Sequence, residues 1–452
     1  MAGVQQDRNL RDFLAFAFFH TFARANEKLA IDGGTPVRTQ PLPQEWCGAH
    51  FMDEQEADAA ARVCRSKTLF RYYGLKLRNE VAALEREFAD YLGVKYALAV
   101  SSGTGALQVA LGALGIGPGD EVLVQGYFWV STVGAVVRSG AIPVLVDCDA
   151  TFDMDPEDAR RKITPRTKAI LVVHMGGVIG RITEIVALAR QHKLKVIEDC
   201  AQAAGASQNG VKAGTFGDLA IFSLQMNKHM TSGEGGMVVT GDEHLYRRAF
   251  AIHDLGYPRN DAGRLVMDDP DYQLWGIGCR MSELTGAVAR VQLKKLDRIT
   301  GAMRTAKYAI KDALSGILTF REVPDPTGDA GSFLMTVFPS REQSLAFTAA
   351  LRAEGVVADT GGMYPIHMDD WGLHIYYNVA SLVNKRGISA VSPWQMAENR
   401  ASADISYAKG TCPHLDDRVS RTMIFCVASI LTQTDVQDIV AAYRKVAAAV
   451  CR

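Results

Sequence analysis

The sequence predicts an α/β fold: a mostly parallel central sheet covered by helices, followed by a smaller α+β domain. Two observations lead to this prediction. Short apolar runs alternate with helical patterns from about residue 80 to 240, and Gly, Pro and Asp bound the runs. A long helical pattern at 280–299 then gives way to a stretch of different character. Strands that alternate with helices form parallel sheets that are buried on both faces.

Six apolar runs have the length and composition of buried strands. They are residues 121–125, 142–147, 168–174, 194–199, 219–223 and 236–240, and helical patterns at 155–163 and 182–193 lie between them. In sheets of this kind, ligands bind beyond the carboxyl ends of the strands. We therefore expect functional residues directly after these runs.

The 452 residues divide into an N-terminal arm (1–55), a large domain (56–300) and a small C-terminal domain (301–452). In the small domain we expect a strand within 331–339 and a closing helix at 434–450. The apolar stretch 13–19 is far shorter than the ~20 residues that cross a bilayer. We expect it to belong to an amphipathic helix that packs on the body or on a partner subunit.

Charge and cysteine content narrow the class of function. A net charge of -1 gives no electrostatic reason to expect nucleic acid or an anionic membrane as a partner. The substrate is expected to be a small molecule bound in a pocket. The eight cysteines include no CxxC pair, which argues against a zinc site or a disulfide framework and favours reduced thiols in the cytoplasm.

Three features that follow predicted strands each have two explanations. The stretch "SSGTG" at 101–105 opens a helix whose unpaired N–H groups suit a phosphate, although Ser and Thr also serve simply as N-caps. Asp199 could accept a hydrogen bond from a protonated ring nitrogen, or it could cap a helix. The aromatic residues 127–129 could stack on a planar ligand or pack in the core.

A fourth feature, Lys228, lies in "SLQMNKHMTSGEGGMVV", where the ordinary explanation is an exposed loop lysine. Burial would instead lower the pKa of this amine and allow it to attack an aldehyde. A phosphate cradle, an aromatic ring, a carboxylate and an amine are together what pyridoxal phosphate needs from a protein. The sequence therefore predicts a pyridoxal phosphate site, with no metal, anchored at Lys228.

Several motifs resemble the DegT/DnrJ/EryC1/StrS family of sugar and cyclitol aminotransferases, from about residue 29 to the C-terminus. They are "SSGTGAL", "WVST", "VIEDCAQAAGA", "GTFGDLAIFS", "NKHMTSGEGGMV" and "RMSEL". The resemblance implies a homodimeric fold-type I enzyme that moves an amino group from L-glutamine or L-glutamate to a keto-cyclitol or ketosugar, as in aminocyclitol antibiotic biosynthesis. The lead-in "LAIDGGTPVRTQPLPQEW" favours the glutamine:scyllo-inosose aminotransferase and aminohydroxybenzoate synthase branch.

Two alternatives remain open beside that branch. An aminotransferase of nucleotide-linked ketosugars would share every cofactor residue and differ only at the acceptor site. A catalytically silent regulator could keep the fold without the reaction, although the complete set of cofactor residues argues against it. A related sugar dehydratase carries histidine at the lysine position, so Lys228 argues against that reaction.

The resemblance also implies roles for single residues. Lys228 would form the internal aldimine and transfer the proton, Asp199 would pair with the pyridine nitrogen, and Trp129 would stack on the ring. The remaining candidates are Gln202 near the ring, Gly103, Thr104 and Ser223 at the phosphate, and Tyr364 and His367 of "YPIHM" at the substrate.

The chain departs from the family at one position that matters for assembly. Many members read G-x-N-x-R before the long helix, and the asparagine reaches the phosphate of the neighbouring subunit's cofactor. Here the stretch is "GIGCR", so Gly278 takes that place without a side chain. Either another residue takes over this contact, or the contact between the subunits is weaker. A site shared between two subunits is still expected from the other motifs.

Overall fold

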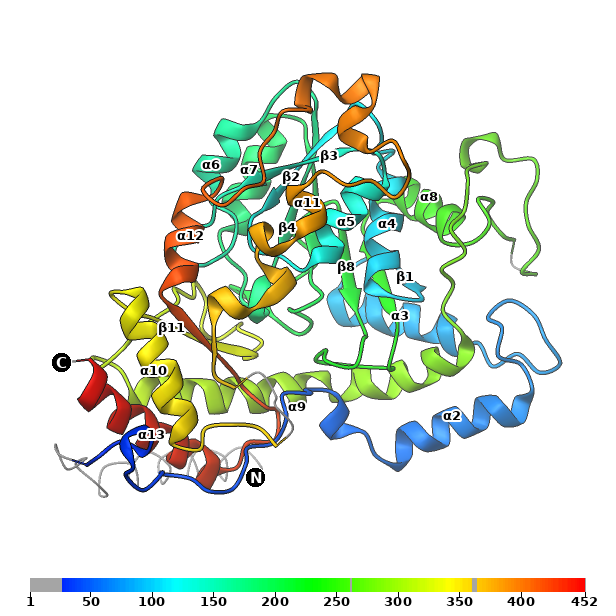
Figure 1. Ribbon diagram of the computed structural model, residues 1–452. Helices are drawn as coiled ribbons and strands as arrows, with labels where there is room; N and C mark the ends of the chain where they lie inside the picture. Colours follow the sequence, from blue (N-terminus) through cyan, green and yellow to red (C-terminus); the bar gives the residue numbers. More distant parts are fainter. Residues whose placement is uncertain (1–26, 261, 360–363, 452) are drawn as a thin grey trace.

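The computed structural model describes residues 27–260, 262–359 and 364–451 (Figure 1). The amphipathic helix predicted around 13–19 lies outside these residues. Within the described ranges, no helix combines the length and the apolar character needed to cross a membrane.

The large sheet has seven strands in the order β1-β9-β8-β5-β4-β2-β3. Every adjacent pair is parallel except those of β9, which runs antiparallel to both β1 and β8. The six predicted strands are confirmed, and β1 is a seventh that leads into the "SSGTG" stretch. The strands are β1 (Tyr96–Val100), β2 (Glu121–Gln125), β3 (Ile142–Val146), β4 (Thr167–Val173), β5 (Lys195–Asp199), β8 (Leu219–Ser223) and β9 (Gly236–Thr240).

Helices cover both faces of this sheet because alternate strand residues point to opposite sides. Val122 and Val124 of β2 enter one hydrophobic core, and Leu123 between them enters the other. The first core is shared with α4 (Gly103–Ala113), α5 (Val130–Arg138) and α8 (Glu243–His253). The second is shared with α3 (Glu80–Leu92), α6 (Pro156–Lys162), α7 (Ile182–Gln191) and α9 (Glu283–Ala313).

Helix α9 runs beneath the large sheet and continues into the smaller part of the molecule (Figure 1). Its N-cap is Ser282, whose hydroxyl accepts a hydrogen bond from the Thr285 N–H, and the helix itself has 31 residues. It packs against α2 (Glu54–Ser66) and α3, and also against α13 (Gln433–Val450). The helix predicted at 280–299 therefore extends to Ala313, because buried residues recur at helical spacing beyond Thr300. The domain boundary at 300 falls inside a continuous helix and stays a prediction.

A second, antiparallel sheet has the order β10-β11-β13-β12 and packs with α10 (Arg341–Ala353) and α13. Its strands are β10 (Thr319–Phe320), β11 (Phe333–Val337), β13 (Thr422–Cys426) and β12 (Ile366–His367), and a short hairpin, β6 (Ser207–Gln208) with β7 (Val211–Lys212), lies apart from both sheets. The strand expected within 331–339 and the closing helix expected at 434–450 correspond to β11 and α13.

Between β12 and β13 the chain returns to the large sheet, where α11 (Ala380–Val383) lies across it (Figure 1). Trp371, Tyr376 and Leu415 belong to the same hydrophobic core as β2. The Asp147 carboxylate accepts hydrogen bonds from the N–H groups of His414 (2.9 Å) and Leu415 (2.8 Å), at the start of α12 (Pro413–Ser420). Residues of the C-terminal third therefore form part of the wall above the sheet.

The N-terminal arm is held by a buried carboxylate, Glu354. Its oxygens accept hydrogen bonds from the N–H groups of Ala30 (2.8 Å) and Val37 (3.0 Å), and the ammonium of Lys445 lies 2.8 Å away. The side chain of Glu354 is fully buried, and Lys445 also donates to the carbonyl of Thr35. A buried carboxylate is tolerated only when it is paired in this way, so this pair fixes the path of the arm.

We expect Glu354→Gln to destabilise the protein, because it leaves the Lys445 ammonium buried without a counter-charge. Removing one partner of a buried ion pair costs about 3–5 kcal/mol in free energy of unfolding. Urea unfolding followed by circular dichroism should show the loss. Glu342→Gln, an exposed change in the first turn of α10, whose C-cap is Glu354, is the control and should leave the midpoint unchanged. Equal midpoints for the two variants would show that the Glu354–Lys445 ion pair does not stabilise the protein.

Candidate active site

The carboxyl ends of the parallel strands place the predicted residues at one edge of the sheet. Asp199 is the last residue of β5, and Ser223 is the last residue of β8. Lys228 lies in the loop between β8 and β9. The base of this loop is closed by Leu224, whose N–H donates to the carbonyl of Gly235 (2.9 Å). The strand order therefore brings together residues that are far apart in the sequence.

The Lys228 backbone is fixed from two sides. Its N–H donates to the carbonyl of Gln225 (3.0 Å), and its carbonyl accepts from the N–H of Gly48 in the arm (3.0 Å). A Cβ on Gly48 would lie 2.9 Å from the carbonyl oxygen of His229, so the arm approaches this loop more closely than a larger residue allows. The side chain of His229 turns away to Ser332, with its Nε2 2.6 Å from the Ser332 hydroxyl.

The charges of Lys228 and Asp199 act on each other. Burial lowers the pKa of the Lys228 amine, and the Asp199 carboxylate opposes this shift. Burial raises the pKa of Asp199, and Lys228 is among the groups that oppose it. Desolvation disfavours both charged forms, whereas their attraction favours both. Lys228 thus keeps a larger neutral fraction than a surface lysine, which is the form that attacks an aldehyde.

The Asp199 carboxylate is oriented by two donors. The hydroxyl of Thr132, on α5, donates to Oδ2 (2.9 Å), and the N–H of Ala201 donates to Oδ1 (3.1 Å). Asp199 is 3% exposed and Thr132 is fully buried. Each carboxylate oxygen can accept more than one hydrogen bond, so capacity remains for a protonated ring nitrogen. Nothing in the sequence marks Thr132 for this role, because a threonine within a helix gives no signal of its partner.

The three aromatic residues after β2 separate into two environments. Tyr127 and Phe128 are fully buried in the core, whereas Trp129 is 42% exposed at the start of α5. Trp129 also contacts the imidazole of His374, with ring centroids 4.7 Å apart. Trp129 is therefore the aromatic ring available to a ligand, and its stacking on a cofactor stays a prediction.

The predicted phosphate residues lie where two helices begin. Ser102 caps α4 by accepting from the N–H of Gly105 (3.0 Å), and Thr104 donates from its hydroxyl to Ser131 Oγ on α5 (2.9 Å). A Cβ on Gly103 would lie 2.8 Å from Cβ of Ser223, so only glycine fits beside β8. Ser102 thus serves as the N-cap, and the first N–H groups of α4 provide the positive end of a helix dipole.

Gln202 lies beyond β5 with its Oε1 accepting from the N–H of Gly176 (2.9 Å). Its side chain is partly exposed. A role near the cofactor ring remains a prediction, because no contact in the described structure tests it.

Tyr364 and His367 lie within the smaller domain rather than in an open pocket. Tyr364 is fully buried and packs on Phe425 at a centroid distance of 4.9 Å. His367, in β12, has Nε2 3.0 Å from the carbonyl of Ser420, and burial lowers the pKa of its ring. These contacts give neither side chain an open face, so a substrate role stays a prediction that the geometry does not support.

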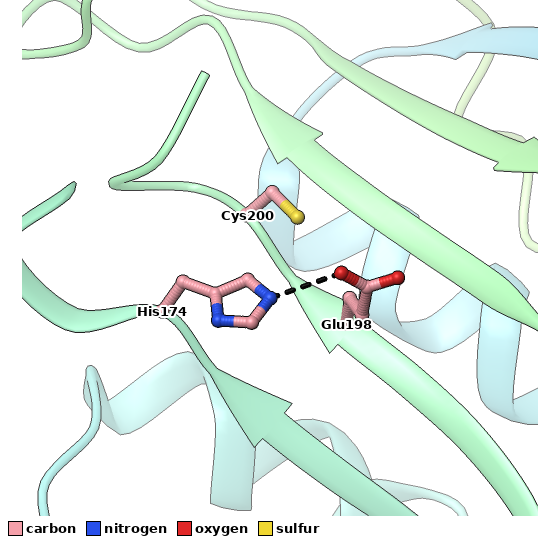
Figure 2. Close-up of side chains that lie close together, drawn as sticks. All are labelled: His174, Glu198 and Cys200. Carbon is pink, nitrogen blue, oxygen red and sulfur yellow. Dashed lines mark hydrogen bonds and ion pairs between the residues drawn. The ribbon is translucent and has the colours of Figure 1, made fainter. Parts of the chain in front are cut away.

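His174, Glu198 and Cys200 form a buried group whose nitrogen, oxygen and sulfur atoms lie within 4.8 Å of one another (Figure 2). Figure 2 shows the His174 ring directed at the Glu198 carboxylate, and the Nε2–Oε2 distance is 3.0 Å. Both oxygens of Glu198 already accept backbone hydrogen bonds, from Phe216 and Gly217 at Oε1 and from Gly214 at Oε2. Burial raises the pKa of the Cys200 thiol well above its usual value, which disfavours the thiolate that a metal would need. We interpret this group as a brace for the turn at 214–217.

Comparison with known proteins gives a family and several relatives. The model of the DegT/DnrJ/EryC1/StrS aminotransferase family matches residues 51–384. The L-glutamine:2-deoxy-scyllo-inosose aminotransferase of Streptomyces kanamyceticus is 38% identical over 297 residues, which is 64% of this chain and 68% of that relative. The GDP-perosamine synthase of Caulobacter vibrioides is 42% identical over 261 residues, 57% of this chain and 66% of the relative.

The chain belongs to the DegT/DnrJ/EryC1/StrS aminotransferase family. The crystal structure of 3-amino-5-hydroxybenzoic acid synthase, 26% identical, superposes with a TM-score of 0.70 and covers 90% of this chain and 98% of its own. The predicted fold type is thereby confirmed, and so are the aminotransferase class and the pyridoxal phosphate cofactor. The residues present fit this cofactor, because the helix start at Gly103, which lies close against Ser223, suits a phosphate, and the paired charges of Lys228 and Asp199 suit an aldehyde and a ring nitrogen.

We expect Gly103→Ala to weaken pyridoxal phosphate binding by about tenfold, or ~1.4 kcal/mol, because the added methyl group collides with Ser223 where the phosphate is predicted to bind. The dissociation constant would be measured by titrating the apoprotein with the cofactor.

Gly134→Ala, on α5, is the matched control, because a Cβ there meets nothing within 4 Å. An unchanged dissociation constant for Gly103→Ala would show that the phosphate binds elsewhere.

Proposed function

We propose that this enzyme transfers the amino group of L-glutamine or L-glutamate to the ketone of a keto-cyclitol or ketosugar. The observation that carries the proposal is the electrostatic pairing of Lys228, which is partly buried, with the buried Asp199. Thr132, which bonds to Asp199, lies on the helix that starts after the exposed Trp129. The similarity to glutamine:scyllo-inosose aminotransferases supports both the donor and the class of acceptor.

Each residue has a distinct task in this reaction. Pyridoxal phosphate, when bound, supplies an aldehyde that combines with amines and a ring that withdraws electrons from the reacting carbon. Asp199, oriented by Thr132, accepts a hydrogen bond from the ring nitrogen and keeps it protonated. The Nζ atom of Lys228 takes the proton from the donor carbon and returns one when the acceptor is aminated. Gly103, Thr104 and Ser223 hold the phosphate.

A nucleotide-linked ketosugar is the second candidate acceptor. The 42% identity to GDP-perosamine synthase is the observation that favours it, although that match covers fewer residues than the cyclitol relative. Both acceptors present a ketone beside hydroxyl groups, so the cofactor residues serve either one. We favour the cyclitol on the longer match.

The function is tested by assaying the purified protein with L-glutamine, and separately L-glutamate, and two acceptors, a keto-cyclitol (scyllo-inosose) and a nucleotide-linked ketosugar. We expect mass analysis to show the aminated cyclitol, and we expect the protein to be yellow from bound cofactor. Lys228→Ala should lose the visible absorbance and all turnover, because no other residue replaces its amine.

Lys168→Ala, an exposed change in β4, is the control and should keep both properties. A protein that stays colourless after incubation with excess cofactor would contradict the proposal and favour a silent regulator. Turnover of the nucleotide-linked ketosugar alone would select the second acceptor.

We further propose a homodimer. Two loops, 67–78 and the described residues of 255–278, lie on the same side of the ribbon (Figure 1), and a Cβ on Gly263 would lie 2.8 Å from the carbonyl oxygen of Tyr72. Both loops carry exposed apolar side chains. These are Leu69, Tyr73, Leu75, Leu255, Met267, Trp275 and Ile277, and Trp275 is 94% exposed. Large exposed apolar groups mark protein interfaces. Gly278, in the second of these loops, has φ +66°, and a Cβ there would meet nothing within 4 Å. Within the described subunit, no other side chain occupies the place of the family's asparagine.

We expect Trp275→Ser to weaken dimerisation by at least tenfold, because a central tryptophan contributes about 2 kcal/mol or more to an interface. Sedimentation velocity over a concentration series would measure the dissociation constant. Ile388→Ser removes another strongly exposed apolar group (74%) and should have no effect. A wild-type monomer at all concentrations would contradict the dimer.

We also propose a cytoplasmic location, which is supported by the free state of all eight cysteines.

A further inference from the structure

His374 is a residue of the C-terminal segment that the structure places at the active site. It ends the 3-10 turn Gly372–His374, and its carbonyl accepts from the N–H of Phe128 (3.0 Å). The next residue, Ile375, forms a β-bridge with Tyr127. The segment thus extends alongside the residues that lead from β2 to Trp129, and His374 takes a fixed position beside Trp129.

The imidazole is held between two indole rings. Its centroid lies 4.7 Å from that of Trp129 and 4.5 Å from that of Trp371. The positive charge of Lys228 acts on this ring, which places His374 within electrostatic reach of the reacting amine. Trp371 is buried and Trp129 is exposed, so the imidazole lies at the boundary between the core and the open part of the site.

The hydrogen bond at Nδ1 fixes the tautomer. Nδ1 lies 3.0 Å from the carbonyl oxygen of Trp371, and a carbonyl can only accept, so Nδ1 carries the proton. Burial, together with the charge of Lys228, lowers the pKa of His374 to about 4 and keeps the ring neutral at physiological pH. The lone pair of a neutral imidazole is then on Nε2.

The Nε2 atom has no hydrogen-bond partner among the described residues. It is also not among the unpartnered polar atoms that are closed off from solvent, so it remains accessible. It is therefore an acceptor that can reach a ligand. The other histidines near this region differ: His229 is bonded to Ser332 through Nε2, and His367 is bonded to Ser420.

We propose that Nε2 of His374 accepts a hydrogen bond from a hydroxyl group of the keto acceptor bound beside Trp129. This inference rests on the proposed function, since it requires a polyhydroxylated ketone. Hydroxyl groups flank the ketone in cyclitols and sugars, and each offers one donor to a fixed, neutral acceptor. His374 is then a residue that contacts the acceptor and selects for its hydroxyl pattern.

Two variants separate this contact from a packing role. In His374→Asn the amide N–H can keep the bond to the Trp371 carbonyl, but nothing replaces Nε2. In His374→Gln the amide oxygen reaches further and can restore an acceptor. We expect kcat/KM for scyllo-inosose to fall about 10- to 100-fold in the Asn variant, the usual range for one lost partner, with partial recovery in the Gln variant.

The half-reaction with L-glutamine should change by less than about twofold in both variants, because the donor does not need this contact. A panel of monodeoxy analogues of scyllo-inosose then identifies the hydroxyl. The analogue that lacks the contacted hydroxyl should react at equal rates with wild type and the Asn variant, because the contact is already absent. Equal losses with every analogue, or a slower glutamine half-reaction, would overturn the proposal. If the enzyme turns over only the nucleotide-linked ketosugar, the same comparison is made with monodeoxy analogues of that ketosugar.

A measurement without turnover distinguishes failure of this inference from failure of the proposed function. Nitrogen NMR of histidine-labelled protein, with His374 assigned by comparison with the Asn variant, should show an Nδ1–H tautomer at neutral pH. A proton on Nε2, or on both nitrogens, would overturn the inference even in an active enzyme. An absence of turnover with every acceptor, together with the expected tautomer, would reject the proposed function and, with it, the hydroxyl contact.

Discussion

The attraction between Lys228 and Asp199 within a desolvated edge of the sheet is the interaction on which the site depends. Burial favours the neutral form of both groups, whereas their pairing opposes the shift of each. In the proposed reaction, this balance leaves an amine that can react and a carboxylate that can hold a ring nitrogen. Neither shift would arise on a fully exposed loop, so the packing around the two groups is what makes their pairing matter.

Several distant segments supply that packing. The arm reaches Lys228 through Gly48 and is itself fixed by the buried Glu354–Lys445 pair. The C-terminal segment returns to the sheet and brings His374 to Trp129. Helix α9 joins the two parts of the molecule without a break. The site is therefore built from both ends of the chain, although its chemistry is concentrated between residues 101 and 228.

The sequence was informative where the signal is local. Asp199 and Ser223 end apolar strands, and the start of α4 comes shortly after one; these positions alone predicted the edge of the sheet at which they meet. The sequence signal was ambiguous in "YPIHMDDWGLH", where His367 was the candidate and its substrate role stays a prediction. The structure uses Nε2 of His367 for Ser420 and presents His374, seven residues later, at the site. Two histidines in one loop give no local sign of which one is turned inward.

Hydrophobic periodicity, strand-end polar residues and the family motifs determined the fold class and the cofactor from sequence alone, and they predict Lys228 as the anchoring lysine. Tertiary structure decided which aromatic ring is open, which threonine orients Asp199, and which histidine has a free lone pair. These features depend on contacts between residues as much as 246 positions apart, such as Phe128 with His374. Because such contacts follow from the packing of whole elements, no short stretch of sequence contains them.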